Sequence, residues 1–282
     1  MGMKRVPVRY VAPGALAMVL CWMAVVHERQ TLGPPVVIAL AVVAGGGWAA
    51  YMISCLNQGM WLGAAHQDMT WYAYRRPCIG TEPDGTGSED FAFLVGQMVR
   101  VEERVAAFAA ETGMASITLA VKGGRVGTWR EAASIRTGQR GHVALGHIWF
   151  GPERNAVMPF ILEHELAHLR RQDSRSRLVG GTIGVVLATL CAGLLPLAVA
   201  AVALAGLGAG WVVYRWWGEL ACDRAAARRC GRQTALACWR QELDGERVIP
   251  LMPRLFFSFL ALRSHPPTRL RLWLSRWAPP GL

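Results

Sequence analysis

The sequence predicts a mainly α-helical membrane protein, in which four transmembrane helices accompany a cytosolic α+β domain. Of its 282 residues, 53% are hydrophobic and only 17% are charged. That composition is too apolar for an ordinary soluble domain and indicates a membrane protein. Four apolar segments hold the excess of hydrophobic residues. The rest of the chain shows the helical and strand-like patterns of an α+β domain.

The first two apolar segments cover about residues 10–26 and 35–55. They follow three basic residues among the first nine, a pattern that a cleaved secretory signal also has. Because a second spanning segment follows the first directly, we interpret residues 1–56 as an N-terminal transmembrane hairpin that stays in the protein.

A second transmembrane hairpin is predicted in residues 178–217, which hold no charged residue before Arg215. As helices, these residues span about 60 Å, enough for two crossings of a hydrocarbon core of about 30 Å. The stretch from Gly193 to Pro196 provides the break between the two helices. A helix pair buried in a soluble core is the alternative, and the length of the uncharged run argues against it.

The second hairpin divides the cytosolic domain into residues 57–177 and 218–282. In its first part, residues 88–112 carry apolar side chains at helical spacing. Residues 116–121 and 142–150 show the alternation of apolar and polar side chains that is typical of strands. The α+β class of this domain follows from these patterns.

The stretch from Glu163 to His168 contains the pattern His-Glu-x-x-His. Two residues four apart lie on one face of a helix, so His164 and His168 can reach a single metal ion. Glu165 lies beside them and can take a proton from a water whose pKa zinc lowers to about 7. Two solvated histidines on a charged helix are the alternative. We interpret residues 156–171 as a zinc helix that carries two ligands and a general base.

Glu219 and Asp223 are candidates for the residues that such a site still needs. A catalytic zinc site has three protein ligands and one open position. The two acidic residues are four apart on a predicted helix, so they share a face. We expect Glu219 to be the third ligand and Asp223 to accept the free ring N–H of a ligating histidine. Asp173 is a further candidate for that accepting role. A solvated acidic pair among arginines is the alternative.

These motifs resemble those of the HtpX-like family of membrane zinc metallopeptidases, which includes the CAAX prenyl proteases. The resemblance lies in residues 164–173, 219–231 and 264–272, and in the order of apolar segments, zinc helix and third-ligand helix. It implies a zincin-like catalytic domain of the gluzincin type with one zinc ion per chain. It also implies an endopeptidase whose substrates are polypeptides such as misfolded or membrane proteins.

The resemblance implies roles for His265 and Arg271 as well. The family often ends its catalytic domain with Ser/Thr-His-Pro-Pro and an arginine six residues after the histidine. Amide hydrolysis needs a second donor to the oxyanion, so we expect His265 to donate to it or to orient a ligand. We expect Arg271 to pair with Asp223 or Asp173. The alternative is that His265 caps a helix and Arg271 is a solvated or lipid-facing charge.

Two features depart from the family's pattern. Residues 133–138 stand where the family often has Asn-Ala-Phe-Ala-x-Gly, and they lack the asparagine. The gap between His168 and Glu219 is short, which is similar to the BlaR/MecR-type sensor proteases, the nearest alternative. A non-catalytic membrane scaffold of the same fold is a further alternative. Residues 142–150 are the candidate edge strand for binding an extended substrate.

The net charge of +11 arises largely from arginines beside the apolar segments. By the positive-inside rule, both termini and the catalytic domain face the cytoplasm, and the protein is integral to the cytoplasmic membrane. Lipid headgroups attract such arginines, so we expect the bilayer as a partner and no nucleic acid. Seven cysteines without a Cys-x-x-Cys pair give no disulfide framework, and Cys222 is interpreted as a small buried thiol.

Overall fold

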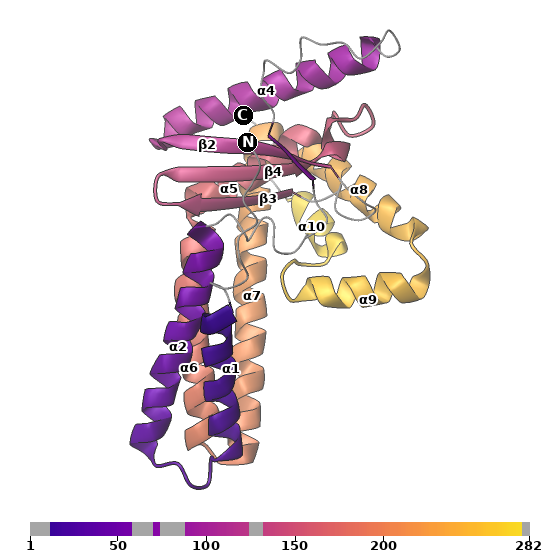
Figure 1. Ribbon diagram of the computed structural model, residues 1–282. Coiled ribbons are helices and arrows are strands. Elements are labelled where there is room, and N and C mark those ends of the chain that lie inside the picture. Colours follow the sequence, from indigo (N-terminus) through magenta and orange to yellow (C-terminus); the bar gives the residue numbers. More distant parts are fainter. Residues whose placement is uncertain (1–11, 58–69, 74–87, 124–131, 278–282) are drawn as a thin grey trace. The chain divides into compact units, whose positions relative to one another are not determined.

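The computed structural model describes residues 12–57, 70–73, 88–123 and 132–277, which are mostly helical (Figure 1). These residues form two compact units. The apolar unit comprises residues 12–57 and 173–214, and the α+β unit comprises the other described residues. The helices are α1 Ala12–His27, α2 Pro34–Asn57, α4 Ser88–Thr112, α5 Met158–Arg171, α6 Asp173–Leu194, α7 Leu197–Cys230, α8 Arg232–Val248, α9 Leu251–Leu262 and α10 Thr268–Ser275. The strands are β1 Thr70–Ala73, β2 Ser116–Gly123, β3 Ala132–Thr137 and β4 Arg140–Gly146, and η3 is a 3-10 helix, His147–Phe150.

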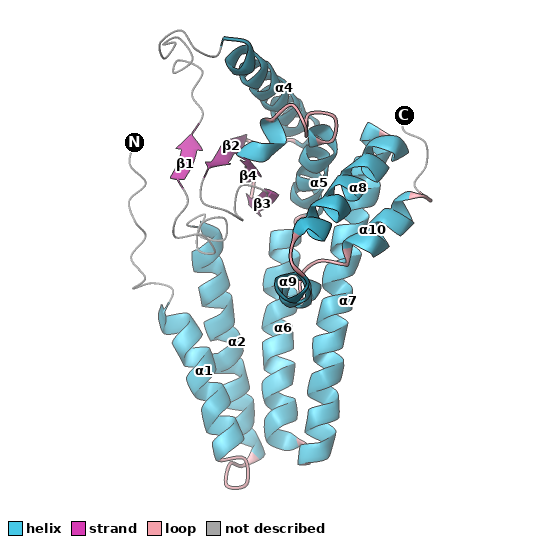
Figure 2. Ribbon diagram, turned by 90° about the vertical axis from the view of Figure 1, so that its right-hand side faces the viewer, coloured by secondary structure: helices cyan, strands magenta, loops and turns pink. Residues whose placement is uncertain are grey.

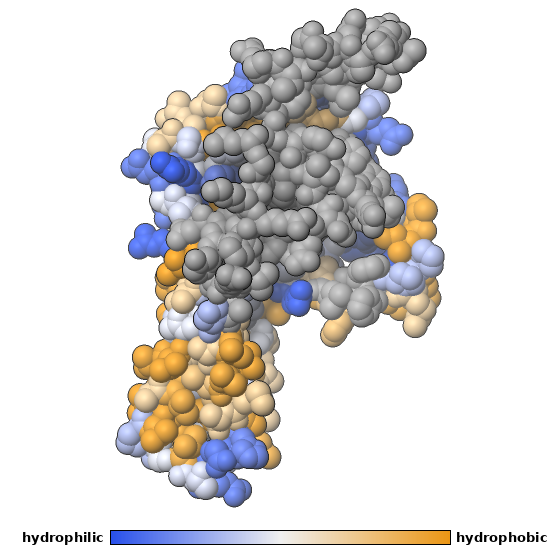
Figure 3. All heavy atoms as spheres, viewed as in Figure 1, coloured by the Kyte–Doolittle hydropathy of each residue, from blue (hydrophilic) through white to orange (hydrophobic). Residues whose placement is uncertain are grey.

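The apolar unit consists of α1, α2, α6 and the first part of α7 (Figure 2). Among the described residues, α2, α6 and α7 are long and apolar enough to cross a membrane, and α1 is a shorter apolar helix. Figure 3 shows apolar side chains over much of the visible face of this unit. These three helices support the predicted membrane class.

Close contact between α1 and α2 explains why a glycine stands at Gly14 and at Gly47. A Cβ atom on Gly14 would lie 2.6 Å from the carbonyl oxygen of Gly47, and one on Gly47 would lie 2.7 Å from that of Gly14. Any larger side chain at either position would push the two backbones apart. This is how small residues allow helices to pack in membranes.

Helix α7 runs without a break through the predicted domain boundary at residues 217 and 218. Its 34 residues correspond to a length of about 51 Å. The uncharged part of α7 lies in the apolar unit, and the part from Arg215 onward lies in the α+β unit. No loop therefore separates the fourth predicted span from the turns that carry Glu219 and Asp223.

The α+β unit contains a four-stranded mixed sheet in the order β1-β2-β4-β3. Strand β2 pairs with β1 in antiparallel and with β4 in parallel orientation, and β3 pairs with β4 in antiparallel orientation. Helix α5 packs against β3 and β4, and α4 packs against β2 and α5. The core between them includes Phe108, Val143, Leu145, Phe160 and Leu166.

The prediction of one strand over residues 142–150 is wrong. Strand β4 ends at Gly146, and the chain continues as η3. Trp149 and Phe150 are both buried, and adjacent residues of a strand point to opposite faces of a sheet. The 3-10 turn lets both side chains enter the same core.

The expected edge strand is also misplaced, because β4 lies between β2 and β3. Among the described strands, the one at the edge beside α5 is β3, which lies within residues 132–137. Gly138, with φ +60°, makes the turn from β3 to β4. The two β-branched residues Ile135 and Thr137 before this glycine are the signal that could have predicted the hairpin.

Candidate metal centre

Helix α5 brings three of the predicted residues to the centre of the α+β unit. His164, Glu165 and His168 have exposed fractions of 6%, 6% and 9%. The helix starts at Met158, with Pro159 in its first turn, where a missing N–H costs nothing. It ends at Gln172, whose left-handed backbone conformation stops the helix one turn after His168. Burial excludes the alternative that these histidines are solvated.

Glu163, which precedes the motif, is held by arginines from two other helices. Arg104 of α4 donates to both of its carboxylate oxygens, and Arg229 of α7 lies 3.8 Å from one of them. These contacts link α4, α5 and α7 and fix the rotation of α5 about its axis. No local sequence pattern joins the three residues, so this link could not be predicted from the sequence.

The ligand atoms predicted for zinc converge at one point. His164 Nε2 lies 3.1 Å from His168 Nε2 and 3.4 Å from Glu219 Oε2, and His168 Nε2 lies 3.6 Å from Glu219 Oε1. Zn–N and Zn–O bonds of about 2.0–2.1 Å at tetrahedral angles separate the ligand atoms by about 3.3 Å. The observed separations are of this order, and these three buried residues could hold one metal ion.

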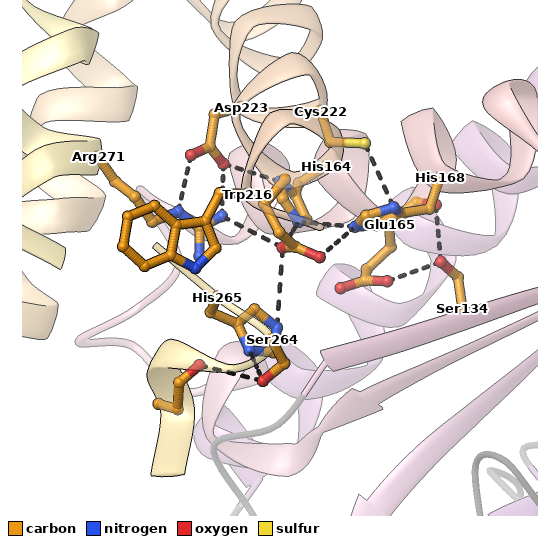
Figure 4. A network of polar contacts seen from close by, with 12 residues as sticks. Ser134, His164, Glu165, His168, Trp216, Cys222, Asp223, Ser264, His265 and Arg271 are labelled. Atoms are coloured by element: carbon orange, nitrogen blue, oxygen red, sulfur yellow. Dashed lines mark hydrogen bonds and ion pairs between the residues drawn. The ribbon is translucent and has the colours of Figure 1, made fainter. Parts of the chain in front are cut away.

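The other ring nitrogens of the two histidines lie beside a carboxylate and a thiol. His164 Nδ1 lies 2.8 Å from Asp223 Oδ1, and His168 Nδ1 lies 3.3 Å from Cys222 Sγ (Figure 4). A carboxylate accepts only, so this contact favours the tautomer of His164 that carries its proton on Nδ1 and leaves the lone pair of Nε2 for a metal. Cys222 lies on the outer side of the His168 ring, so its sulfur is not in the ligand set formed by His164, His168 and Glu219.

The surroundings of His164 favour positive charge. Burial disfavours its imidazolium form, but hydrogen bonds to Asp223 and Glu219 outweigh this effect and raise the pKa of His164 to about 9. The negative groups that favour the proton also favour a metal cation. Proton and metal compete for the same imidazole nitrogen.

Arg271 closes the outer side of the site. It donates from Nε to Asp223 Oδ2 at 2.7 Å and from Nη2 to Asp223 Oδ1 at 2.6 Å. Its guanidinium carbon lies 3.8 Å from the centre of the Trp239 ring on α8. The planar fork of arginine suits both contacts, which lysine would not reproduce. Arg271 therefore docks α10 onto α7 and α8, and it holds the carboxylate that orients His164.

Replacing Arg271 by methionine is expected to destabilise the protein and to weaken metal binding. Asp223 would become a buried carboxylate without its arginine, which lowers the free energy of unfolding by about 3–5 kcal/mol. Since Asp223 orients His164, zinc affinity should fall about 10–100-fold. Denaturant unfolding in detergent and competition with a zinc chelator measure the two quantities.

Arg276, exposed just after α10, offers a matched control. We expect Arg276→Met to change the unfolding free energy by no more than about 0.5 kcal/mol. If Arg271→Met kept the zinc affinity of the unmodified protein, the positioning role of the arginine would be refuted.

Glu165 is positioned by a residue that the sequence analysis did not single out. Ser134 of β3 has its Oγ 2.7 Å from Glu165 Oε2 and 2.9 Å from the Glu165 carbonyl oxygen (Figure 4). The single hydroxyl proton of the serine is shared between these two oxygens, and this contact holds the carboxylate against the edge of the sheet. Strand β3 thus contributes both to the sheet and to the site.

His265 approaches the ligand set from the loop before α10. Its Nε2 lies 3.7 Å from Glu219 Oε2, and its Nδ1 lies 2.9 Å from Ser264 Oγ. Desolvation and the nearby positive charge of Arg271 lower the pKa of His265, although about half of its side chain is exposed. A neutral ring near Glu219 can donate one hydrogen bond. This distance agrees with a place within one water of the predicted metal.

Asp173 is the first residue of α6, and its side chain is buried. It belongs to the apolar unit, whereas the other predicted site residues belong to the α+β unit. Arg271 was expected to pair with either Asp223 or Asp173, and in the structure it pairs with Asp223. A contribution of Asp173 to the orientation of a ligand stays a prediction.

Comparison of the sequence with protein-family models gives no match, and comparison with curated proteins gives none either. The resemblance to the HtpX-like metallopeptidases therefore stays a prediction, which rests on the sequence blocks that carry it.

Proposed function

We propose that the chain is a membrane-embedded, zinc-dependent endopeptidase similar to the HtpX-like metallopeptidases. The observation that carries this proposal is the convergence of His164, His168 and Glu219, with Glu165 buried next to His164 in the same helix. Two imidazoles and one carboxylate are a ligand set of catalytic zinc, whereas structural zinc sites have four protein ligands.

The residues of the chain have separate roles in the proposed reaction. A zinc ion held by this ligand set would lower the pKa of a bound water to about 7 and would polarise a carbonyl group. Glu165 takes the proton of the attacking water and then gives it to the leaving amine. Ser134 holds the Glu165 carboxylate in place through its hydroxyl. His265 donates to the oxyanion of the substrate.

We further propose that the substrate is an extended polypeptide that pairs with β3. In the sheet of described strands, β3 has β4 on one side only. An exposed edge binds a peptide through backbone hydrogen bonds, which do not depend on sequence. Such binding suits polypeptides of varied sequence, such as misfolded or membrane proteins.

In this proposal α1 is a fourth span, and the α6–α7 hairpin divides a zincin-like catalytic domain. The described part of α1 has 16 residues, and the predicted first residues of this span, before Ala12, lie outside the described residues. Arginines flank both ends of the hairpin, at 170–177 and 215–229. By the positive-inside rule, the catalytic domain then faces the cytoplasm and the protein is integral to the cytoplasmic membrane.

A metal and activity assay on the purified full chain tests this function. We expect about one zinc ion per chain, and hydrolysis of a casein-like substrate that a chelator abolishes and added zinc restores. A protein that holds zinc at these residues and hydrolyses no peptide bond would instead be a non-catalytic scaffold. A protein without zinc affinity would refute the metal centre.

A further inference from the structure

Helix α9 presents a row of apolar side chains at the surface of the α+β unit. The α9 stripe consists of residues with exposed fractions of 55% to 75%: Leu251, Met252, Leu255 and Phe259. They follow each other at intervals of one, three and four residues, so they lie on one side of the helix. Figure 3 shows apolar side chains at the surface in the region of α9. A contiguous apolar row of this kind marks an interaction surface.

The C-terminal end of α9 is attached to α7 where the charged residues of α7 begin. The Trp216 ring N–H donates to the carbonyl oxygen of Leu262 at 2.7 Å. Trp216 directly follows Arg215, which ends the uncharged run of α7. An apolar helix that crosses a membrane meets the headgroups where its first charged residues stand, and tryptophan is enriched at that level. Figures 1 and 2 show α9 crosswise to the part of α7 that carries Glu219.

The charge of the C-terminal region suits an anionic surface. Residues 247–282 contain six arginines and no acidic residue. Arg247 precedes α9, Arg254 lies within it and Arg263 follows it. A helix with one apolar side and basic residues around it is the pattern of helices that lie in the interface of anionic membranes. These charges favour lipid, and not a second copy of this chain, as the partner that covers the α9 stripe. A second copy would bring the same arginines to the contact, and like charges repel each other.

We propose that α9 lies in the headgroup region of the bilayer, with the α9 stripe among the acyl chains. Helix α9 also forms one wall of a cavity of about 440 Å³, between α8 and the loop that leads to α10. Leu255, Ser258, His265 and Arg271 line this cavity, and His265 lies 3.7 Å from Glu219. The cavity therefore joins the membrane-facing helix to the metal centre. If the proposed function holds, the substrates are polypeptide segments close to the bilayer surface, such as those that flank a transmembrane helix.

Membrane depth is measured on the full chain in vesicles of phosphatidylcholine and phosphatidylglycerol. A nitroxide label on a Phe259→Cys variant should collide more with oxygen, which concentrates in lipid, than with a water-soluble nickel chelate. The same label on Ala107→Cys, at an exposed position of α4, should show the reverse order. The native cysteines of the chain can also react with the nitroxide reagent. Protein without either substitution, treated with the same reagent, measures their contribution to the signal.

Two results of the depth measurement would overturn the proposal. If the nickel chelate reached position 259 as well as position 107, α9 would lie in water. If neither reagent reached position 259, a protein surface would cover the α9 stripe. This measurement does not depend on catalysis, so its outcome is separate from that of the proposed function.

The peptidase activity of the chain tests the place of α9 in a second way. In a variant with Met252→Glu and Phe259→Glu, kcat/KM should fall by at least about tenfold for a peptide tethered beside a transmembrane anchor, because membrane binding raises its local concentration. The rate with the same peptide free in solution should stay unchanged, and Ala107→Glu should change neither rate. An equal fall for both substrates would contradict the proposal. Absence of hydrolysis by the unmodified protein would contradict the proposed function instead, and the depth result would still decide the place of α9.

Discussion

Replacing Glu165 by glutamine is expected to abolish peptide hydrolysis while zinc and fold are kept. An amide does not accept the proton of the attacking water, and a positioned general base contributes about 10²–10⁴-fold to a rate. We expect turnover of a casein-like substrate to fall by about 10³-fold. The amide oxygen of the glutamine can still accept the hydrogen bond that Ser134 donates to Glu165. Zinc content and the unfolding transition should therefore match those of the unmodified protein.

Glu153, exposed in the turns before α5, provides a carboxylate control outside the site. The substitution Glu153→Gln should leave turnover within about twofold of normal, because surface substitutions away from a site have small effects. Turnover close to normal with Glu165→Gln would refute the role of Glu165 as the general base. A parallel loss of zinc and activity would indicate that Glu165 holds the metal or the fold.

Replacing His168 by alanine is expected to remove zinc from the purified protein. Loss of one of three protein ligands removes a donor atom and leaves Glu219 facing a cavity. Loss of an outer partner alone costs about 10–100-fold in metal affinity, so loss of a ligand should cost more than about 100-fold. Metal analysis after dialysis should then show almost no zinc, against about one ion per unmodified chain.

His142 on β4 is the matched control for this experiment, because it is a partly buried histidine outside the predicted ligand set. Zinc content should be unchanged in His142→Ala. If His168→Ala held zinc as tightly as the unmodified protein, the assignment of the metal centre would be wrong. Circular dichroism of both variants shows whether a loss of zinc comes with a loss of fold.

Several parts of the fold could be predicted because their signals are local. The helix over residues 88–112 has the predicted bounds, and the predicted break at residues 193–196 separates α6 from α7. The helix predicted to carry zinc starts at Met158 instead of residue 156, because the preceding residues form turns. Apolar spacing, glycine and proline act on the neighbouring backbone alone, so the sequence shows their effect directly.

The sheet could not be predicted to the same extent. In the sequence, Trp149 fits the alternation of a strand. In the structure, Trp149 and its neighbour Phe150 are both buried in the core, so the strand ends before them and a 3-10 helix follows. Which strand stands at the edge depends on pairing between segments distant along the chain. Ser134 could therefore be assigned to the site only once β3 was seen beside α5.

By itself, the sequence determined which side chains share a helix face. The spacing of four residues places His164 with His168 and Glu219 with Asp223, because backbone hydrogen bonds set the period of a helix locally. Only the tertiary structure decided that these two faces meet at ligand distances.

The tertiary structure also added Ser134, Cys222 and Trp239 to the site, and it brought the predicted residues His265 and Arg271 to it. These contacts connect residues that are 31 to 54 positions apart in the sequence. They form because helices and strands pack their side chains into one shared core. Packing depends on every segment of that core at once, which no local pattern contains.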